Sequence, residues 1–156
     1  MYLSYMIYQG HRTANRSQDQ LNIAYPYTIE PQPEGGFLVQ FADLEEAFTE
    51  GETEEQADFN AAEVLTAVLA QRIEDGDTIP LPQEAQGRPV AVPDAPVQAA
   101  LLLHFARQGH TLSELARAMG TSWPAVQRLM KPGNPTLKQL ERAAAALGKR
   151  LVLSLE

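Results

Sequence analysis

The sequence predicts an α+β protein in which a ββαβ module, residues 25–94, precedes an all-helical module with a short C-terminal strand, residues 95–156. Three observations support this prediction. Two segments with strand-like alternation, "YPYTIEP" and "FLVQFADL", flank the turn-forming residues "PQPEGG". A segment with a helix-capping pattern follows them. Four further helical segments, each ended by glycine or interrupted by proline, fill most of the remaining chain.

The first two strands are expected to form a β-hairpin. Tyr27 and Ile29 alternate with polar residues in the first strand, and Phe37, Val39 and Phe41 recur at every second position in the second. Two such segments on either side of a glycine- and proline-containing turn are typical of a hairpin.

A long helix and a third strand are expected to complete this module. The segment "TEEQ" predicts a capping box in which the Thr53 hydroxyl and the Gln56 amide satisfy each other's backbone N–H groups. Apolar positions continue at helical spacing from Ala57 to about Ile73, and "EDGD" ends the helix. The proline-rich segment that follows cannot be helical, but "RPVAVP" is predicted to return to the hairpin as a strand. The prolines between about 80 and 96 are expected to space the two modules semi-rigidly.

Charge is divided unevenly between the two modules. Residues 1–94 contain 4 Arg, no Lys and 17 Asp and Glu, a net charge of −13, whereas residues 95–156 contain 8 Lys and Arg and 3 Glu, a net charge of +5. Although the whole chain has a formal charge of −8, this asymmetry predicts two modules that face partners of opposite charge.

Composition excludes several classes of site. The chain has no cysteine, which excludes disulfides, thiol catalysis and cysteine-based zinc sites, and its histidines, His11, His104 and His110, are too widely spaced to suggest a metal site. No apolar run approaches the roughly 18 residues of a membrane span, and no signal peptide is recognised, so a soluble cytoplasmic protein without membrane association is expected. Residues 1–24 leave two interpretations open, a mobile extension or a misplaced start.

No catalytic residue, metal or cofactor is expected. Two-metal hydrolysis needs carboxylates that converge from separate strands and a helix, yet the predicted strands supply only Glu30 and Asp43. No serine or histidine has the sequence context of an activated nucleophile, and no phosphate-binding glycine loop is found.

The segment "TLSELARAMGTSWPAVQRLM" predicts two short helices joined by a tight turn. Thr111 and Glu114 form a capping box, and apolar residues from Leu112 to Met119 share one face of the first helix. Gly120 lies where the chain must turn with positive φ. The second helix is capped by Ser122.

The second helix directs a polar, basic and carboxylate-free surface outward. Glutamine and arginine side chains suit the base edges of the DNA major groove, and lysines suit phosphates. A plain helical bundle with a solvated face is the alternative. The predicted DNA-contacting residues are Ser122, Trp123, Pro124, Gln127, Arg128, Lys131 and Lys138, although Trp123 could equally pack on a neighbouring helix.

The segments "LSELARAMGTSWPAVQRL" and "NPTLKQLERAAAALG" resemble the lambda-repressor-like (Cro/C1, or XRE) helix-turn-helix family over most of residues 97–150. The resemblance implies that residues 122–131 enter the major groove of a palindromic operator and that the protein is a homodimer or higher oligomer. Trp123 and Pro124 depart from the polar residues usual at these positions. The terminal "RLVLSL" is predicted to be a strand that could pair across the two-fold axis.

The segments "PEGGFLVQFADLEEAFTEGETEEQA", "AAEVLTAVL" and "DTIPLP" resemble the HicB antitoxin family, helix-turn-helix subclass. The resemblance covers residues 25–156 together with the DNA-binding segment. It implies a partial ribonuclease H-like fold that binds and occludes a small basic mRNA-cleaving toxin, HicA, in a type II toxin–antitoxin pair. The N-terminal part of the chain, residues 1–94 with a charge of −13, would compete with RNA for the cationic surface of such a toxin.

The carboxylates of the segment between the hairpin and the helix are the candidates for toxin binding. They are Asp43, Glu45, Glu46, Glu50 and Glu52. A solvated acidic face without a partner is the alternative for this cluster. At the level of function, the alternative is a transcriptional repressor whose acidic module senses a small ligand, followed by an orphan antitoxin or a metal-dependent nuclease.

Overall fold

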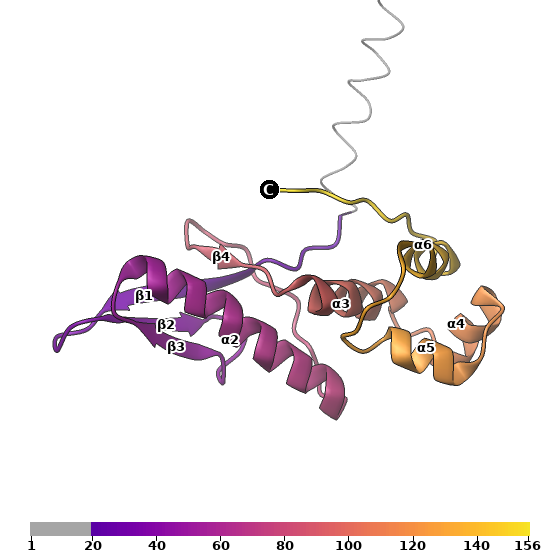
Figure 1. Cartoon of the computed structure of the whole chain (residues 1–156), viewed down its shortest axis with the longest axis horizontal. Helices are drawn as coiled ribbons and strands as arrows, with labels where there is room; N and C mark the ends of the chain where they lie inside the picture. Colours follow the sequence, from indigo (N-terminus) through magenta and orange to yellow (C-terminus); the bar gives the residue numbers. More distant parts are fainter. Residues whose placement is uncertain (1–19) are drawn as a thin grey trace, which may run out of the picture.

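The computed structural model describes residues 20–156, and its architecture is mixed α+β (Figure 1). A four-stranded antiparallel sheet with strand order β3-β2-β1-β4 is covered on one face by the long helix α2, and four shorter helices follow. Residues 1–19 of the predicted extension lie outside the described residues. None of the helices in the described part of the chain has the length and apolarity needed to cross a bilayer.

The predicted hairpin and the returning strand are confirmed. β1 (Tyr25–Pro31) and β2 (Phe37–Phe41) pair antiparallel with Tyr27 opposite Phe41, and β4 (Val90–Ala91) pairs with the other edge of β1. Between β1 and β2, Gly35 and Gly36 adopt φ values of 100° and 80°, a conformation that side chains with a Cβ rarely adopt.

A further strand lies where the sequence analysis expected only a loop. β3 (Phe48–Gly51) pairs antiparallel with β2 and forms one edge of the sheet. The expectation was wrong because β3 has four residues and none of them is buried, so the sequence carries no buried alternation there. Of the acidic residues assigned to a loop, Glu50 therefore lies in a strand.

Helix α2 (Glu54–Asp75) begins and ends as the sequence predicts, with one difference at its start. The Thr53 hydroxyl accepts a hydrogen bond from Gln56 N at 3.1 Å, and Gly76 ends the helix with φ of 73°. The Gln56 amide oxygen, however, accepts from Glu52 N at 2.7 Å instead of from Thr53 N, so the reciprocal half of the predicted capping box is wrong.

Close approach of β3 to α2 depends on Gly51. A Cβ on Gly51 would lie 2.4 Å from the backbone nitrogen of Ala57, in the first turn of α2. Only glycine therefore allows the strand to end against the helix. The resulting core is formed by the apolar faces of β1 and β2 and by the inner face of α2, where Leu65 and Leu69 are fully buried.

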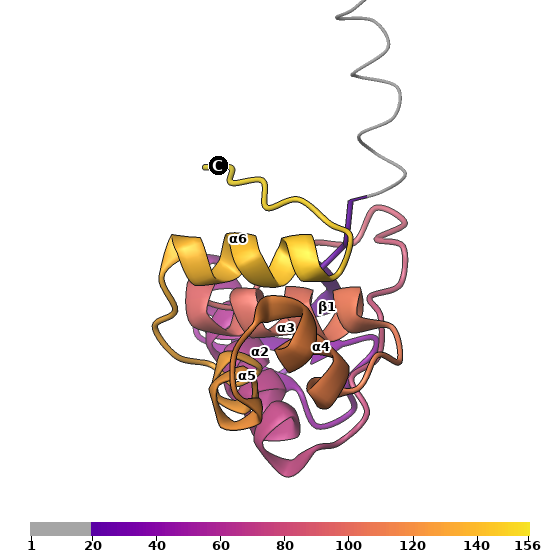
Figure 2. The same ribbon diagram turned by 90° about the vertical axis from the view of Figure 1, so that its right-hand side faces the viewer.

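The four predicted C-terminal helices are confirmed as α3 (Ala95–Arg107), α4 (Leu112–Met119), α5 (Trp123–Leu129) and α6 (Leu137–Ala146) (Figure 2). They surround a second core that contains buried side chains of α4, α5 and α6. Helix α3 serves both cores, because Val97 and Leu101 pack with the sheet and α2 whereas Leu103 packs with the other helices.

The chain beyond α6 does not form the expected strand. Residues 149–156 are irregular, and Val152, Leu153 and Leu155 are exposed. The alternation in "RLVLSL" favours a strand, but no strand within residues 20–156 pairs with it. The prediction of a C-terminal strand is therefore wrong for the single chain.

Candidate functional site

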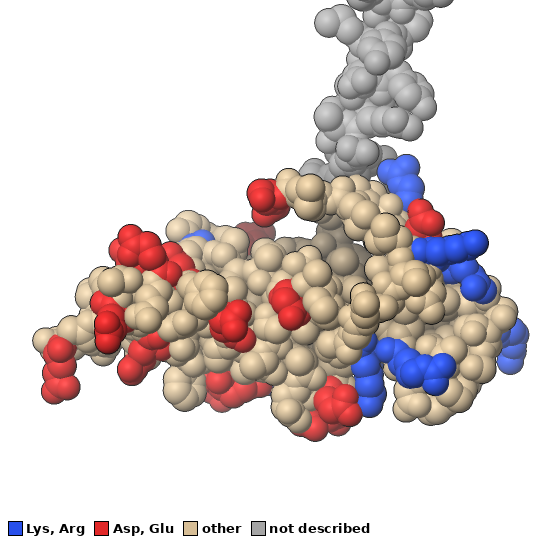
Figure 3. Space-filling view, in the orientation of Figure 1, with Lys and Arg blue, Asp and Glu red and all other residues tan. Residues whose placement is uncertain are grey.

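The charge division predicted from the sequence is also a division in space. On the face shown in Figure 3, carboxylates gather over the sheet and α2, whereas most lysines and arginines gather over the region of α4, α5 and α6. Each region carries several of the residues predicted to contact a partner.

Two of the predicted toxin-binding carboxylates are engaged within the chain. Glu46 forms a two-pronged ion pair with Arg72 of α2, with oxygen–nitrogen distances of 2.5 and 3.1 Å. The hydrogen bond from Arg72 holds the pKa of Glu46 below its usual range. Asp43 accepts a hydrogen bond from Gln83 N at 3.1 Å, which fastens the proline-rich segment to the sheet. Both residues therefore support the structure of the acidic module.

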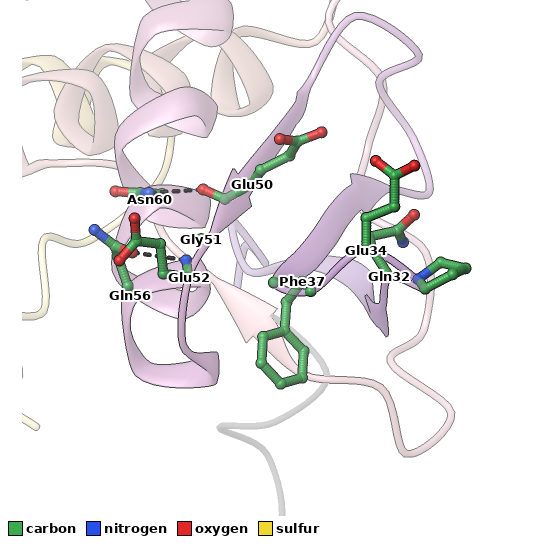
Figure 4. A pocket seen from close by; sticks show the side chains of 11 residues that line it. Gln32, Glu34, Phe37, Glu50, Gly51, Glu52, Gln56 and Asn60 are labelled. Atoms are coloured by element: carbon green, nitrogen blue, oxygen red, sulfur yellow. Dashed lines mark hydrogen bonds between the residues drawn. The ribbon is translucent and has the colours of Figure 1, made fainter.

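The other three predicted carboxylates, Glu45, Glu50 and Glu52, are exposed and have no ion-pair partner among residues 20–156. Glu50 and Glu52 line a groove of about 650 Å³ between the β1–β2 turn and the first turns of α2 (Figure 4). Glu34 in the turn adds a third carboxylate to its lining, and sequence reasoning did not select this residue.

Backbone hydrogen bonds hold the α2 side of this groove. The Asn60 amide donates to the Glu50 carbonyl at 2.8 Å, and Gln56 accepts from Glu52 N (Figure 4). These bonds fix the backbone of Glu50 and Glu52, and so the end of β3, against the helix. The groove is acidic and has no cation among its lining residues, so it suits a positively charged group.

Helices α4 and α5 have the geometry expected from the sequence. Thr111 and Glu114 form the complete capping box of α4, and Gly120 ends α4 with φ of 63°. The Ser122 hydroxyl accepts from Ala125 N at 3.3 Å at the start of α5. Val126 is fully buried, which turns the opposite side of α5 outward.

The predicted DNA-contacting residues of α5 share this outward side. Ser122, Pro124, Gln127 and Arg128 are exposed, and the Trp123 side chain is 45% exposed although apolar. Lys138 in the first turns of α6 is also exposed. Apart from the hydroxyl of Ser122, which caps α5, the side-chain polar groups of these residues make no hydrogen bond within residues 20–156.

Lys131 differs from the other predicted contacts. Its ammonium group lies 2.9 Å from a carboxylate oxygen of Glu74, near the end of α2. This ion pair joins the basic surface to the acidic module across 57 residues of sequence, and the sequence contains no signal for it.

Helix α6 is held in place by further residues that the sequence analysis does not identify. The Arg142 guanidinium donates to the Met119 carbonyl at the end of α4, at 2.5 Å. Thr136 and Gln139 form a complete capping box at the start of α6, and the pattern "TLKQ" would have revealed it. Within the described residues, no three histidine, aspartate or glutamate side chains are grouped as metal ligands.

The N-terminal part of the chain matches a known family. A family model described as "HicB_like antitoxin of bacterial toxin-antitoxin system" matches residues 24–102, the sheet, α2 and the first half of α3.

Curated relatives match over most of the chain. Antitoxin HicB of Escherichia coli K12 is 37% identical over 133 residues, which span 83% of this chain and 96% of that protein. Antitoxin HicB 1 of Photorhabdus laumondii is 36% identical over 137 residues, 86% of this chain and 88% of that protein. Antitoxin HicB of Pseudomonas fluorescens is 28% identical over 141 residues, 86% of this chain and 97% of that protein.

Proposed function

Because the chain belongs to the family of HicB-like antitoxins of bacterial toxin–antitoxin systems, we propose that it binds and occludes a HicA-like mRNA-cleaving toxin and represses its own operon by binding operator DNA. The observation that carries this proposal is the separation of an acidic surface over the sheet and α2 from a basic surface over the C-terminal helices (Figure 3). A toxin that grips RNA and an operator carry opposite charge, so each suits a different end of the molecule.

The acidic module is proposed to neutralise the toxin by occupying its RNA-binding surface. We interpret the sheet and α2 as a partial ribonuclease H-like fold. Of the five carboxylates predicted to bind toxin, Glu45, Glu50 and Glu52 are proposed as contacts because they are exposed and without intramolecular cations among residues 20–156. Asp43 and Glu46 are proposed to act indirectly, through the interactions that hold the segments bearing those contacts.

The C-terminal helices are proposed to form a lambda-repressor-like helix-turn-helix domain. In this proposal α5 enters the major groove with Gln127 and Arg128 as base-reading residues, and Lys131 and Lys138 contact phosphates. Ser122, Trp123 and Pro124 belong to the same reading face. One such helix covers a half-site only, so a palindromic operator would be bound by a homodimer or higher oligomer.

Both proposed activities are stoichiometric binding, and neither needs a turnover site, a metal or a cofactor. We accordingly propose a regulatory, non-enzymatic protein of the cytoplasm, where both the operator and the messenger RNA are found.

Affinity purification from the native cells tests the proposal. The full chain, tagged at the N-terminus, is captured and washed at moderate salt, and the co-eluting protein and DNA are identified. We expect a small basic protein whose expression arrests growth unless this chain is also expressed, together with promoter DNA. Recovery of promoter DNA without such a protein would contradict the antitoxin role and favour a repressor whose acidic module senses a small ligand.

A further inference from the structure

The sheet has a second face, opposite α2, that the described part of the chain leaves open. Side chains alternate between the two faces along each strand, and the strand register assigns them. Tyr27, Val39 and Phe41 point to the α2 side and are buried. The residues directed to the open face are Pro26, Thr28 and Glu30 of β1, Leu38 and Gln40 of β2, Phe48 and Glu50 of β3, and Val90 of β4. Pro26, beside β4, is buried, and the others are exposed or half-buried.

The open face combines an apolar centre with two acidic flanks. Leu38 lies directly between Glu30 on β1 and Glu50 on β3 in the strand register. The two glutamates are therefore two strand spacings, roughly 10 Å, apart on opposite sides of an apolar residue. Neither has an ion-pair partner among residues 20–156.

Phe48 extends the apolar centre toward the edge of the sheet. It pairs with Gln40 in the neighbouring row, and its side chain is 58% exposed. The Gln40 amide is turned toward the loop after β2, where it lies 3.1–3.3 Å from four carbonyl oxygens. The Gln40 amide is thus hydrogen-bonded within the chain, and the aromatic ring of Phe48 lies exposed beside it.

We infer that this open face, centred on Leu38 and Phe48 and flanked by Glu30 and Glu50, is the surface that binds the toxin. The inference rests on the proposed function. The expected occupant is a toxin surface that has an apolar side chain flanked by lysine or arginine side chains, because that pattern complements the row Glu30–Leu38–Glu50.

Other occupants fit this face less well. A second copy of the chain placed face to face would bring the glutamates of one copy against those of the other, which is unfavourable. Nucleic acid would meet the same carboxylates with its phosphates. Glu50 belongs both to this surface and to the lining of the acidic groove. Phe37, which also lines the groove, lies on the other side of the sheet, and Figure 4 shows Glu50 and Phe37 projecting in different directions.

Matched aromatic variants test the apolar part of the surface. The full chain carrying Phe48→Ala is compared with one carrying Phe59→Ala, because Phe59 lies on α2 and is 66% exposed, close to the exposure of Phe48. The probe is the basic protein that co-purifies with the wild-type chain and whose growth arrest the chain relieves. We expect Phe48→Ala to raise the Kd by about tenfold or more, as for aromatic hot spots. Phe59→Ala should leave the Kd unchanged.

Matched charge variants test the flanks without removing any packing. Glu30→Gln combined with Glu50→Gln should lower the association rate constant and flatten its salt dependence. The control combines Glu63→Gln with Glu84→Gln, two carboxylates that are exposed elsewhere on the same module, and should retain more of the wild-type rate. Unchanged thermal unfolding of the double variants shows that both remain folded.

The outcomes separate this inference from the proposed function. If the wild-type chain neutralises the basic protein and both the Phe48 variant and the Glu30/Glu50 variant bind it as tightly and as fast as wild type, the docking surface is wrong while the antitoxin role stands. If the wild-type chain neutralises no basic protein, the antitoxin role fails and this surface assignment fails with it.

Discussion

The partly buried side chain of His104 links α3 to the end of α5. Its Nε2 atom lies 3.1 Å from the Met130 carbonyl, directly after α5. Since a carbonyl only accepts, Nε2 carries the proton in this contact. Burial lowers the pKa of His104, because the charged imidazolium is poorly solvated at this position.

The lowered pKa of His104 predicts a pH-dependent stability. Well above a pH of about 6.5 the imidazole is neutral in both the folded and the unfolded chain, so it contributes no pH dependence there. Below that pH the unfolded chain takes up a proton that the folded chain resists, and the free energy of unfolding falls until the pH passes the lower folded-state pKa. Urea unfolding at pH 7.5 and 5.5 should show a smaller fall for His104→Gln, whose amide can still donate to Met130. An equal fall in both proteins would show that other groups cause the effect.

Gly51 permits a backbone contact that no other residue allows. We expect Gly51→Ala to reduce the free energy of unfolding by about 1–3 kcal/mol, the usual cost of forced overpacking, because the new Cβ meets the backbone of Ala57. Gly133→Ala is the matched control, since its Cβ would lie 3.8 Å from the nearest atom, at an ordinary contact distance. Denaturant titration of both variants checks the prediction, and equal stability would contradict it.

At the scale of elements, helix caps are the features that the sequence predicts most directly. The Thr111 hydroxyl accepts from Glu114 N at 3.1 Å, and the Glu114 carboxylate accepts from Thr111 N at 2.9 Å. The backbone hydrogen bond from Thr111 lowers the pKa of Glu114. Both partners lie three residues apart in the chain, so the pattern alone predicts the contact.

We expect Thr111→Ala to lower the free energy of unfolding by about 1 kcal/mol, because it removes the acceptor for a backbone N–H at the start of α4. Thr111→Ser keeps that acceptor and should remain close to wild type. Thermal or urea unfolding measures both. If alanine and serine behave alike, the capping bond does not contribute to stability.

Elements that depend on distant partners were predicted less well. The hairpin, α2 and the four C-terminal helices follow from local alternation and capping, and the structure confirms them. β3 was missed because its four residues owe their pairing to β2 and not to a pattern of their own. The C-terminal strand was predicted from alternation alone, and it is wrong for the single chain because no strand within residues 20–156 pairs with it.

The candidate sites show the same limit at single residues. Exposure of Gln127 and Arg128 follows from the helical periodicity that buries Val126. The pairing of Glu46 with Arg72, 26 residues apart, and of Lys131 with Glu74 has no local pattern. The sequence therefore identifies the acidic segment but does not separate the carboxylates that hold the structure from those left exposed.

At the scale of the whole molecule, α3 couples two cores that carry surfaces of opposite charge. Its first half packs with the sheet and α2, and Leu103 packs with α4 and α5. The proposed toxin and operator surfaces nevertheless lie on different elements, so a surface substitution on one should leave the other intact.

Arg128→Ala tests that independence. We expect it to remove the preference for operator over unrelated DNA, because it deletes a guanidinium that suits guanine, at a cost of about 1–3 kcal/mol in discrimination. Toxin neutralisation should be unchanged, since Arg128 lies on the exposed side of α5. Electrophoretic mobility shift with operator and scrambled DNA, beside growth rescue, provides both readouts. Loss of both activities together would show that the two surfaces are not separable.

The overall negative charge makes the salt dependence of operator binding a sharp test of the basic surface. A chain of formal charge −8 has no general attraction for DNA, so binding must come from cations gathered locally on the C-terminal helices. Each phosphate contact releases condensed counterions and contributes about −0.9 to the slope of log K against log salt concentration. We therefore expect a steep slope, measured by fluorescence anisotropy over a salt series.

Lys138 and Lys131 should differ in their share of that slope. Lys138 is exposed, and Lys138→Ala should make the slope shallower by about one. Lys131 is already paired with Glu74, so any phosphate that it binds must displace that carboxylate, and Lys131→Ala should change the slope less. Glu74→Gln removes the competing carboxylate and should raise operator affinity. In a chain that carries Glu74→Gln, Lys131→Ala should then change the slope by more than it does in the wild-type chain. A flat salt response in the wild-type chain would instead mean that these cations do not face the DNA backbone.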